Sequence, residues 1–241
     1  MAKNTVLGLC TSGSRLKVAV SDGKRFLGAQ RKVFNQEREL FALVRSGLAK
    51  LGSDLRGVGT VCAARGPGRF TGIRIALTLA GSMQALSGAA VRTATLFEIL
   101  ALQAAESTDY RRRARSGTAG LAVLLHAFKD EYFLQFFTAA PGRRPRPEGE
   151  PAWLKAEAAS QRLAEAGKGI YVIADAEEDP AIYGLLPPGA AAGPRSVSKV
   201  LPAYVIKAAL AFRGPLKPLY LKPAKYELEN NVRPKAARRR P

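Results

Sequence analysis

The sequence between residues 66 and 75 reads Gly66-Pro67-Gly68-Arg69-Phe70-Thr71-Gly72-Ile73-Arg74-Ile75. It lies between an apolar run at 58–63, which predicts a strand, and a helical pattern that continues to about Ser87. Glycines permit a close backbone approach, and a helix N-terminus attracts anions. The segment is not a phosphate-binding P-loop, because no Gly-Lys-Ser/Thr follows at the required spacing. Two interpretations stay open: a tight strand-to-helix connection with Thr71 as the N-cap, and an anion site.

The helix after this segment has apolar side chains on two faces, and its only charged residue is Arg74. One face carries Ile73, Leu77 and Ala80, and the other carries Ile75, Leu79, Met83 and Leu86. A helix that is apolar all round is buried on more than one side. We expect the first face to pack on a sheet and the second to meet a helix of the same chain or a second chain.

The patterns around the helix predict an α/β fold. Alternating or continuous apolar runs predict strands, helical spacing predicts helices, and Asp22-Gly23 is typical of a hairpin turn. The predicted order is three strands, a helix, a strand, the helix described above, a strand and a helix, at 6–10, 16–20, 26–33, 35–52, 58–63, 71–87, 90–92 and 95–105. Antiparallel hairpins followed by βαβ crossovers indicate a mixed sheet with helices on both faces.

The pattern of the second half of the chain predicts a degenerate copy of the first half. The arginine-rich stretch 106–116 has no apolar periodicity and indicates a linker. A second hairpin is expected at 121–125 and 131–137, and the four prolines of 141–151 indicate a loop. Helices are expected at 153–166 and 196–212, with a strand at 170–174 and a basic tail at 236–241.

Composition narrows the class of protein. The chain has 241 residues, 47% of them hydrophobic and 24% charged, which is typical of one large or two small globular domains. No run is long and apolar enough for a membrane span, no secretory signal is visible, and two cysteines do not make a disulfide framework. The cytoplasm is therefore expected. The net charge of +19 is typical of a nucleic-acid binder, although it equally reflects solubility.

A family resemblance follows from two stretches. The segment at 66–75, the small-residue-rich helix after it and the opening Val6-Leu7-Gly8-Leu9-Cys10-Thr11-Ser12 resemble the TsaB family, in the glycoprotease-like branch of the actin-like ATPase superfamily. The resemblance is specific over residues 5–105 and weaker at 125–133 and 218–221. Arg69 stands where the family usually has serine.

The resemblance implies two RNase-H-like lobes, at 1–106 and 107–235, followed by the tail at 236–241. It implies a cytoplasmic role in making threonylcarbamoyladenosine in tRNA, as a non-catalytic scaffold that binds and stabilises the catalytic paralogue TsaD, with the ATPase TsaE joining them. The resemblance implies that the N-terminal helices pair with TsaD. A homodimer formed through these helices is the alternative. No metal or cofactor is expected on this chain alone, and ATP or ADP is expected only at an interface with TsaD.

Candidate site residues follow from these arguments. The partner interface is assigned to the second face of the helix, at Ile75, Leu79, Met83 and Leu86. Anion contacts are assigned around the glycine-rich turn, at Thr11, Ser12, Gly68, Thr71 and Gly72. Contacts to tRNA phosphates are assigned to two basic segments, at Arg111, Arg112, Arg113, Arg238, Arg239 and Arg240.

The residues argue against catalysis by this chain. Its one histidine, His126, excludes a helical histidine pair for a metal, and we expect a hydrogen-bonded imidazole there. Cys10 stands where actin-like ATPases place a magnesium-organising aspartate, and a thiol is a poor magnesium ligand. No Gly-X-Ser-X-Gly elbow is present. Cys10 and Cys62 are expected reduced, at neighbouring strand ends. Two rival hypotheses remain, an actin-like nucleotide-binding ATPase and a basic tRNA-binding module.

Overall fold

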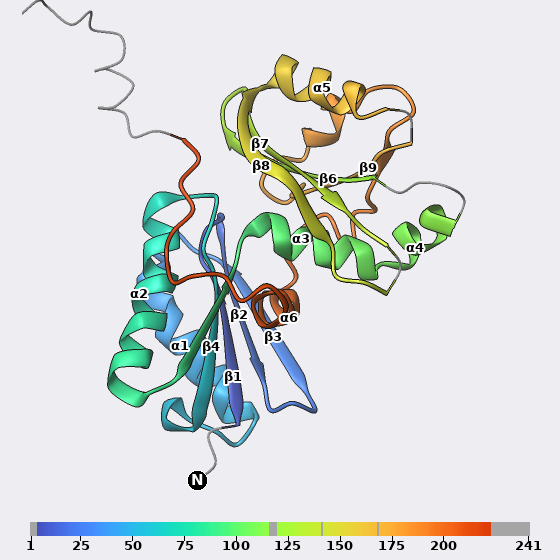
Figure 1. Cartoon of the computed structure of the whole chain (residues 1–241). Coiled ribbons are helices and arrows are strands. Elements are labelled where there is room, and N and C mark those ends of the chain that lie inside the picture. The colour runs from blue at the N-terminus through green and yellow to red at the C-terminus, as the bar shows by residue number, and fades with distance from the viewer. Residues whose placement is uncertain (1–3, 116–119, 141, 168, 223–241) are drawn as a thin grey trace, which may run out of the picture.

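The computed structural model describes residues 4–115, 120–140, 142–167 and 169–222, and it folds into two lobes, each built on a mixed five-stranded sheet (Figure 1). The first sheet has the order β3-β2-β1-β4-β5, with β1 at Thr5–Cys10, β2 at Arg15–Ser21, β3 at Phe26–Lys32, β4 at Val58–Ala64 and β5 at Ala90–Ala94. The second has the order β10-β9-β6-β7-β8, with β6 at Gly120–Phe128, β7 at Glu131–Thr138, β8 at Arg146–Lys155, β9 at Tyr171–Ala174 and β10 at Ala191–Ala192.

The two sheets repeat one topology. In each, an antiparallel meander of three strands is extended by two parallel strands beside its first member. The second copy is reduced, because β10 has two residues and a short 3-10 helix, η2 (Ile182–Leu185), stands between β9 and β10. The predicted fold class, two α/β lobes with a degenerate second copy, is confirmed.

Helices cover both faces of the first sheet (Figure 1). On one face, α1 (Gln36–Lys50) and α2 (Phe70–Ser87) pack on the buried side chains of β1, β2 and β4, with the short η1 (Leu55–Gly57) leading into β4. On the other face lies α6 (Pro202–Phe212), which comes from the far end of the chain. The outer face of the second sheet is covered by α5 (Ala156–Glu165).

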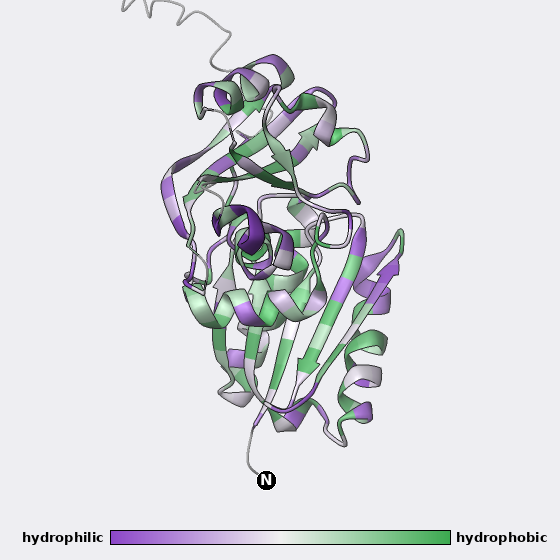
Figure 2. Cartoon of the chain, turned by 90° about the vertical axis from the view of Figure 1, so that its right-hand side faces the viewer, coloured by the Kyte–Doolittle hydropathy of each residue, from purple (hydrophilic) through white to green (hydrophobic). Residues whose placement is uncertain are grey.

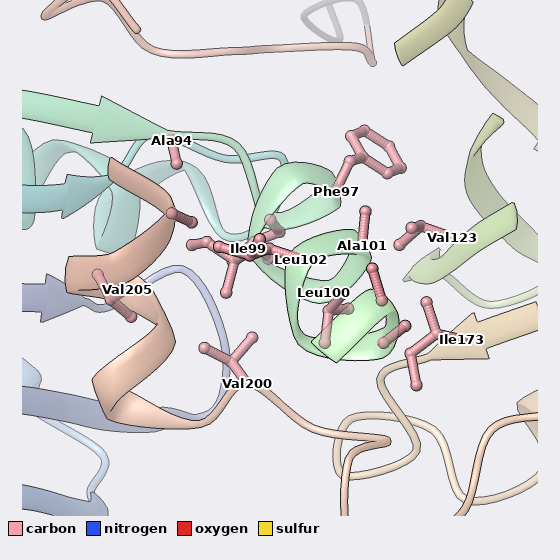
Figure 3. Close-up of a cluster of buried hydrophobic side chains, with 14 of the residues drawn as sticks. Ala94, Phe97, Ile99, Leu100, Ala101, Leu102, Val123, Ile173, Val200 and Val205 are labelled. Atoms are coloured by element: carbon pink, nitrogen blue, oxygen red, sulfur yellow. The ribbon is translucent and has the colours of Figure 1, made fainter. Parts of the chain in front are cut away.

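The core between the lobes is built by α3 (Leu96–Glu106) and α6. In α3 every residue from 96 to 105 is buried except Glu98, which closes a capping box with Thr95. Figure 3 shows Phe97 and Ala101 facing the strands that carry Val123 and Ile173, while Ile99 lies toward Val205 of α6. Each lobe thus ends in a helix that packs on the other lobe, which explains why α3 is apolar all round.

The predicted linker at 106–116 is wrong, because Thr108–Arg115 forms helix α4. Tyr110 holds it in place: the ring is fully buried, its hydroxyl donates to the Ala139 carbonyl at 3.0 Å, and it meets the Tyr171 ring edge-on at 5.2 Å. Apart from Ala114, which packs partly buried against the same core, the remaining side chains are polar, and α4 stands out as a hydrophilic helix in Figure 2. One buried tyrosine and one alanine do not produce a clear periodic signal.

Two other elements differ from expectation. β8 runs through the predicted loop, because it is an edge strand on which Pro147 and Pro151 are tolerated. α6 begins at Pro202 instead of 196, since proline fits the first turn, where its missing N–H is not needed. The expected boundary at 106 falls where the chain passes from the first sheet to the second, and α6 is the element that returns to the first.

The last described residues also return to the first lobe. Gly214 bridges to Thr93 of β5, and the Leu219 amide donates to the Arg65 carbonyl at 2.7 Å. Tyr220 then stacks on Phe70 at the start of α2, with 4.9 Å between ring centroids. Within the described ranges, none of the helices combines the length and hydrophobicity needed to cross a bilayer.

Candidate functional site

A cavity of about 310 Å³ lies between the lobes. From the first lobe it is lined by the β1–β2 turn and the glycine-rich segment, and from the second by the ends of β6 and β9. The polar or charged side chains on its wall are Ser12, Arg15, Lys17, Arg69, His126, Asp175, Glu178 and Lys222.

The glycine-rich segment packs directly on the β1–β2 turn. A Cβ on Gly72 would lie 1.9 Å from the Thr11 carbonyl oxygen, and one on Gly68 would lie 2.5 Å from that of Ser12. The Thr11 hydroxyl donates to the Gly72 carbonyl at 2.5 Å. Gly68 also has a φ of +149°, which other residues rarely adopt. These glycines are needed for backbone-to-backbone contact.

The start of α2 differs from the expected one. The Arg69 carbonyl accepts from the Ile73 amide at 2.9 Å, so Arg69 is the N-cap residue and the helix begins at Phe70. The Arg69 amide in turn donates to the Ser12 carbonyl at 2.8 Å, which fixes the helix start against the β1–β2 turn. Thr71 lies in the first turn with an exposed side chain, so the N-cap prediction for it is wrong.

The five residues assigned to anion contacts do not form one site. Thr11 and Gly72 are buried against each other, and the Ser12 hydroxyl lies 3.4 Å from the Cys10 sulfur. Of the five, Ser12 and Gly68 line the cavity between the lobes, whereas Thr11, Thr71 and Gly72 line a different groove, beside the start of α1. The five residues are therefore divided between two places, and anion binding at either place stays a prediction.

Sequence reasoning missed an acidic segment that faces the turn. Directly after β9 come Asp175, Glu177 and Glu178. Glu178 accepts from both the amide and the hydroxyl of Ser14, each at 2.8 Å. Glu177 pairs with Arg15 at 3.1 Å and with Lys17 at 2.5 Å. The available signal was an acidic run in a basic chain, immediately after the carboxyl end of a buried strand.

Asp175 is the most perturbed carboxylate of this segment. Its side chain is buried, and burial is the main cause that raises its pKa to about 6; the charges of Glu178 and Glu177 act in the same direction, and that of Lys17 opposes them. A carboxyl whose pKa is raised on folding binds its proton more tightly in the folded state. Its contribution to stability is therefore greatest below pH 4 and is lost as the pH rises through about 6.

We expect Asp175→Asn to be more stable than the unchanged chain at pH 8, by about 1–3 kcal/mol, because the amide has no charge to bury. The difference should shrink toward zero near pH 4, where the aspartate is protonated. Urea unfolding across this pH range measures it, with the exposed Asp130→Asn as control. Parallel pH profiles for Asp175→Asn and the unchanged chain would show that the Asp175 charge costs nothing.

The cavity does not fit a magnesium nucleotide. Cys10 is buried, and burial raises the pKa of its thiol. A neutral thiol does not replace a carboxylate toward magnesium. Glu178 on the cavity wall already holds the amide and hydroxyl of Ser14, in the turn beside the cavity.

The two cysteines and the histidine are buried or hydrogen-bonded as structural residues commonly are. Cys10 and Cys62 are free and buried on the neighbouring strands β1 and β4, which confirms the predicted strand relation, and burial raises the pKa of Cys62 to about 12. The His126 imidazole bonds through Nε2 to the Lys129 carbonyl at 2.9 Å, as expected. In the described part of the chain no group of three or more His, Cys, Asp or Glu is placed to hold a metal ion.

A second hollow, of about 440 Å³, lies between α1 and α2 on the outside of the first lobe. It is the α1/α2 groove, lined by Glu37, Leu40, Phe41, Phe70, Thr71, Arg74, Ile75, Thr78, Leu79 and Ser82. Phe41 and Phe70 are 48% and 55% exposed. The face of α2 that carries Ile73 and Leu77 is buried against the sheet, as predicted.

The four interface residues predicted on α2 are placed differently from one another. Ile75 and Leu79 are half-buried on the wall of the groove, and Leu86 is 89% exposed beyond it. Met83 is only 8% exposed and packs in the core under α2, so its outward assignment is corrected. Sequence reasoning also missed Phe41 and Phe70, because helical spacing assigned the first to the core and the second to a turn.

Three of the six basic residues proposed for tRNA contacts lie on α4. Arg111 and Arg112 are exposed and Arg113 is partly so; Asp109 pairs with Arg112 at 2.9 Å and with Arg113 at 3.3 Å. The residues Arg238, Arg239 and Arg240 lie outside the described residues.

Comparison with known proteins bears on the fold. No protein-family model matches the sequence, and no curated protein matches it. A solved structure described as an uncharacterized protein with similarity to peptidase YeaZ, from Pseudomonas aeruginosa, matches with a TM-score of 0.67 and 23% identity, over 92% of this chain and 100% of that one. YeaZ from Pseudomonas aeruginosa matches with a TM-score of 0.66 and 24% identity, over the same shares. The chain therefore has the two-lobed fold of the YeaZ structures along nearly its whole length.

Proposed function

We propose that this chain is a TsaB-type scaffold subunit, without catalysis of its own, in the cytoplasmic machinery that makes threonylcarbamoyladenosine in tRNA. YeaZ is another name for TsaB, so the shared fold supports the resemblance seen at residues 5–105. In this proposal the chain binds and stabilises a TsaD-type catalytic subunit, and a TsaE-type ATPase joins the pair.

The observation that carries the proposal is the exposed α1/α2 groove. Phe41 of α1 and Phe70 at the start of α2 are each about half exposed on its wall, and Leu86, further along α2, is exposed as well. Contiguous apolar surface of this kind marks an interaction site. Two helices with a groove between them fit a partner helix packed along them.

The groove has a polar rim suited to a specific contact. Arg74 lies over the Phe70 ring at 4.8 Å on one side, and Glu37 of α1 lines the other. Charges of both signs beside an apolar centre favour one orientation of the partner. The occupant we propose is a TsaD-type helix pair; a second copy of this chain, giving a homodimer, is the alternative that the experiment separates.

Any nucleotide belongs, in this proposal, to the assembled complex. We place ATP or ADP at an interface with TsaD, because the cavity between the lobes of this chain does not fit it. No metal is assigned to this chain.

The proposal gives α4 a role toward RNA. Its arginines project from a helix that Tyr110 holds in the interlobe core, so they form a fixed basic surface. Arginine guanidinium groups pair well with phosphates, in a way that neutralises charge without reading bases.

Changing Arg111, Arg112 and Arg113 together to glutamine should weaken tRNA binding by the assembled complex. The slope of log affinity against log salt should become shallower by about 1 for each phosphate that these arginines neutralise in the unchanged chain. Filter binding across a salt series measures both. The control changes three exposed basic residues in and beside β3, namely Arg25, Arg31 and Lys32. Equal slopes in the two triple variants would remove α4 from the RNA surface.

The whole proposal is tested by reconstitution. The chain is mixed with TsaD and TsaE of its own source, and complex formation is measured by light scattering beside threonylcarbamoyl transfer to tRNA. We expect a complex with TsaD and no transfer without this chain. A chain that forms only its own dimer, or transfer that is independent of it, would contradict the proposal.

A further inference from the structure

The β1–β2 turn of the first lobe presents hydrogen-bond donors and positive charges at one place. The amide and hydroxyl of Ser14 donate to one acceptor, and the neighbouring cations Arg15 and Lys17 of β2 hold a second one beside it in the sequence. Neutral donors with cations next to them are the groups that hold anions such as carboxylates and phosphates.

The acceptor at this place belongs to the chain itself. One oxygen of Glu178, Oε1, takes both Ser14 bonds at 2.8 Å. The two oxygens of Glu177 divide between Arg15 at 3.1 Å and Lys17 at 2.5 Å. The Lys17 side chain is 3% exposed and that of Glu177 is 13% exposed, so this pair lies largely away from water. A buried ammonium group needs such a partner.

The turn is shaped to receive Glu178. Gly13 leaves room for it, because a Cβ there would lie 2.6 Å from Glu178 Oε1. On the other side, Gln36 at the start of α1 donates to the Gly13 carbonyl at 2.9 Å and supports the turn. Within the second lobe, the Tyr132 hydroxyl of β7 donates to Asp179 at 3.2 Å, and this bond fixes the acidic segment to its own lobe.

We propose that this place is an anion site occupied by the chain's own carboxylates. Glu177 and Glu178, from the second lobe, fill the donors of the first lobe, exclude phosphate-bearing ligands from the cleft and fasten the two lobes together. Ser14 belongs to the first lobe and Glu178, 164 residues further along the chain, to the second, so these bonds join the two lobes. The inference concerns the cleft and does not depend on the partner proposed for the α1/α2 groove.

The test uses thermal unfolding of the full chain at low ionic strength, with and without millimolar inorganic pyrophosphate. Glu178→Ala removes the internal carboxylate and leaves Lys17 paired with Glu177. We expect this variant to melt several degrees lower than the unchanged chain and to be stabilised by pyrophosphate, which takes the vacated Ser14 amide and hydroxyl beside Arg15. The unchanged chain should gain much less.

A second variant displaces the carboxylate without removing its charge. In Gly13→Ala the added methyl group forces Glu178 Oε1 away from Ser14. The Glu178 carboxylate can move because it is the far end of a flexible side chain. We expect a lowered melting temperature here too, with Glu178→Gln intermediate because its amide oxygen still accepts from Ser14. The matched control is Glu165→Ala on α5, an exposed glutamate outside the cleft, which measures the general effect of pyrophosphate on a basic protein.

The outcomes decide the proposal. A pyrophosphate effect in Glu178→Ala beyond that in Glu165→Ala, together with its lowered melting temperature, supports self-occupation. An equal effect in the unchanged chain and Glu178→Ala would overturn it, as would an unaltered melting temperature in both Glu178→Ala and Gly13→Ala. If Glu178→Ala does not fold, Glu178→Gln and Gly13→Ala decide by the same comparison.

Discussion

Replacing Gly72 by alanine should destabilise the chain by about 3–5 kcal/mol, because the methyl group has no place to go. A Cβ at this position would lie 1.9 Å from the Thr11 carbonyl oxygen and 2.9 Å from its carbon. Both are backbone atoms at the buried end of β1, so no side-chain rotation relieves the clash. α2 would have to move away from the sheet, and the bond from the Thr11 hydroxyl to the Gly72 carbonyl would break.

Urea unfolding of Gly72→Ala measures this effect. The matched control is Gly81→Ala on the same helix, where the Cβ would meet only Leu216 Cδ2 at 3.5 Å, an ordinary contact. Alanine is the better helix former by about 1 kcal/mol, so the control should be as stable as the unchanged chain or more so. A Gly72→Ala midpoint equal to that of Gly81→Ala would show that α2 does not pack on β1 as closely as described.

Leu79→Glu should abolish capture of the TsaD-type partner while leaving the isolated chain folded. Leu79 is half-buried on the wall of the α1/α2 groove, so in the free chain a glutamate there can reach water. Under a bound helix its charge would be buried without a partner, at a cost of at least about 2 kcal/mol, which is roughly 30-fold in affinity. Light scattering of the mixture measures capture, and thermal unfolding of the variant alone measures its fold.

Two further variants serve as controls for Leu79→Glu. Leu210→Glu places the same charge on a leucine of α6 that is 42% exposed, outside the groove, and should leave capture intact. Leu77→Glu places it on the sheet-facing side of α2 and should unfold the chain. A folded Leu79→Glu that still captures TsaD would exclude the groove as the interface. If Leu79→Glu unfolds, Leu86→Glu repeats the test at a side chain that is 89% exposed.

Local patterns were enough for the framework of the molecule. The order of elements in the first lobe was predicted from short apolar runs, a turn at Asp22-Gly23 and helical spacing after residue 35. The N-terminus of α3 is likewise local, because Thr95 and Glu98, three residues apart, form its capping box. The two-faced helix after residue 70 was also visible, because helix faces follow from a period of 3.6 residues. Such features depend on residues a few positions apart.

Elements held by one distant contact were not visible. α4 depends on the single buried ring of Tyr110, and β8 carries prolines that only an edge strand tolerates. The rotation of α2 follows the packing under it, so Met83 turned inward although spacing alone grouped it with Leu79. In each case the deciding neighbour lies far along the chain.

The sequence by itself determined that this chain is a two-lobed α/β protein whose glycine-rich segment leads into a helix with two apolar faces. Only the tertiary structure decided what the polar residues around that segment do. Ser14 and Lys17 are donors suited to an anion, but their partners, Glu178 and Glu177, belong to the other lobe and lie far along the chain. Periodicity reports which face of an element is buried; which charges face each other depends on how the two sheets are placed, and that is set by α3 and α6 packed between them.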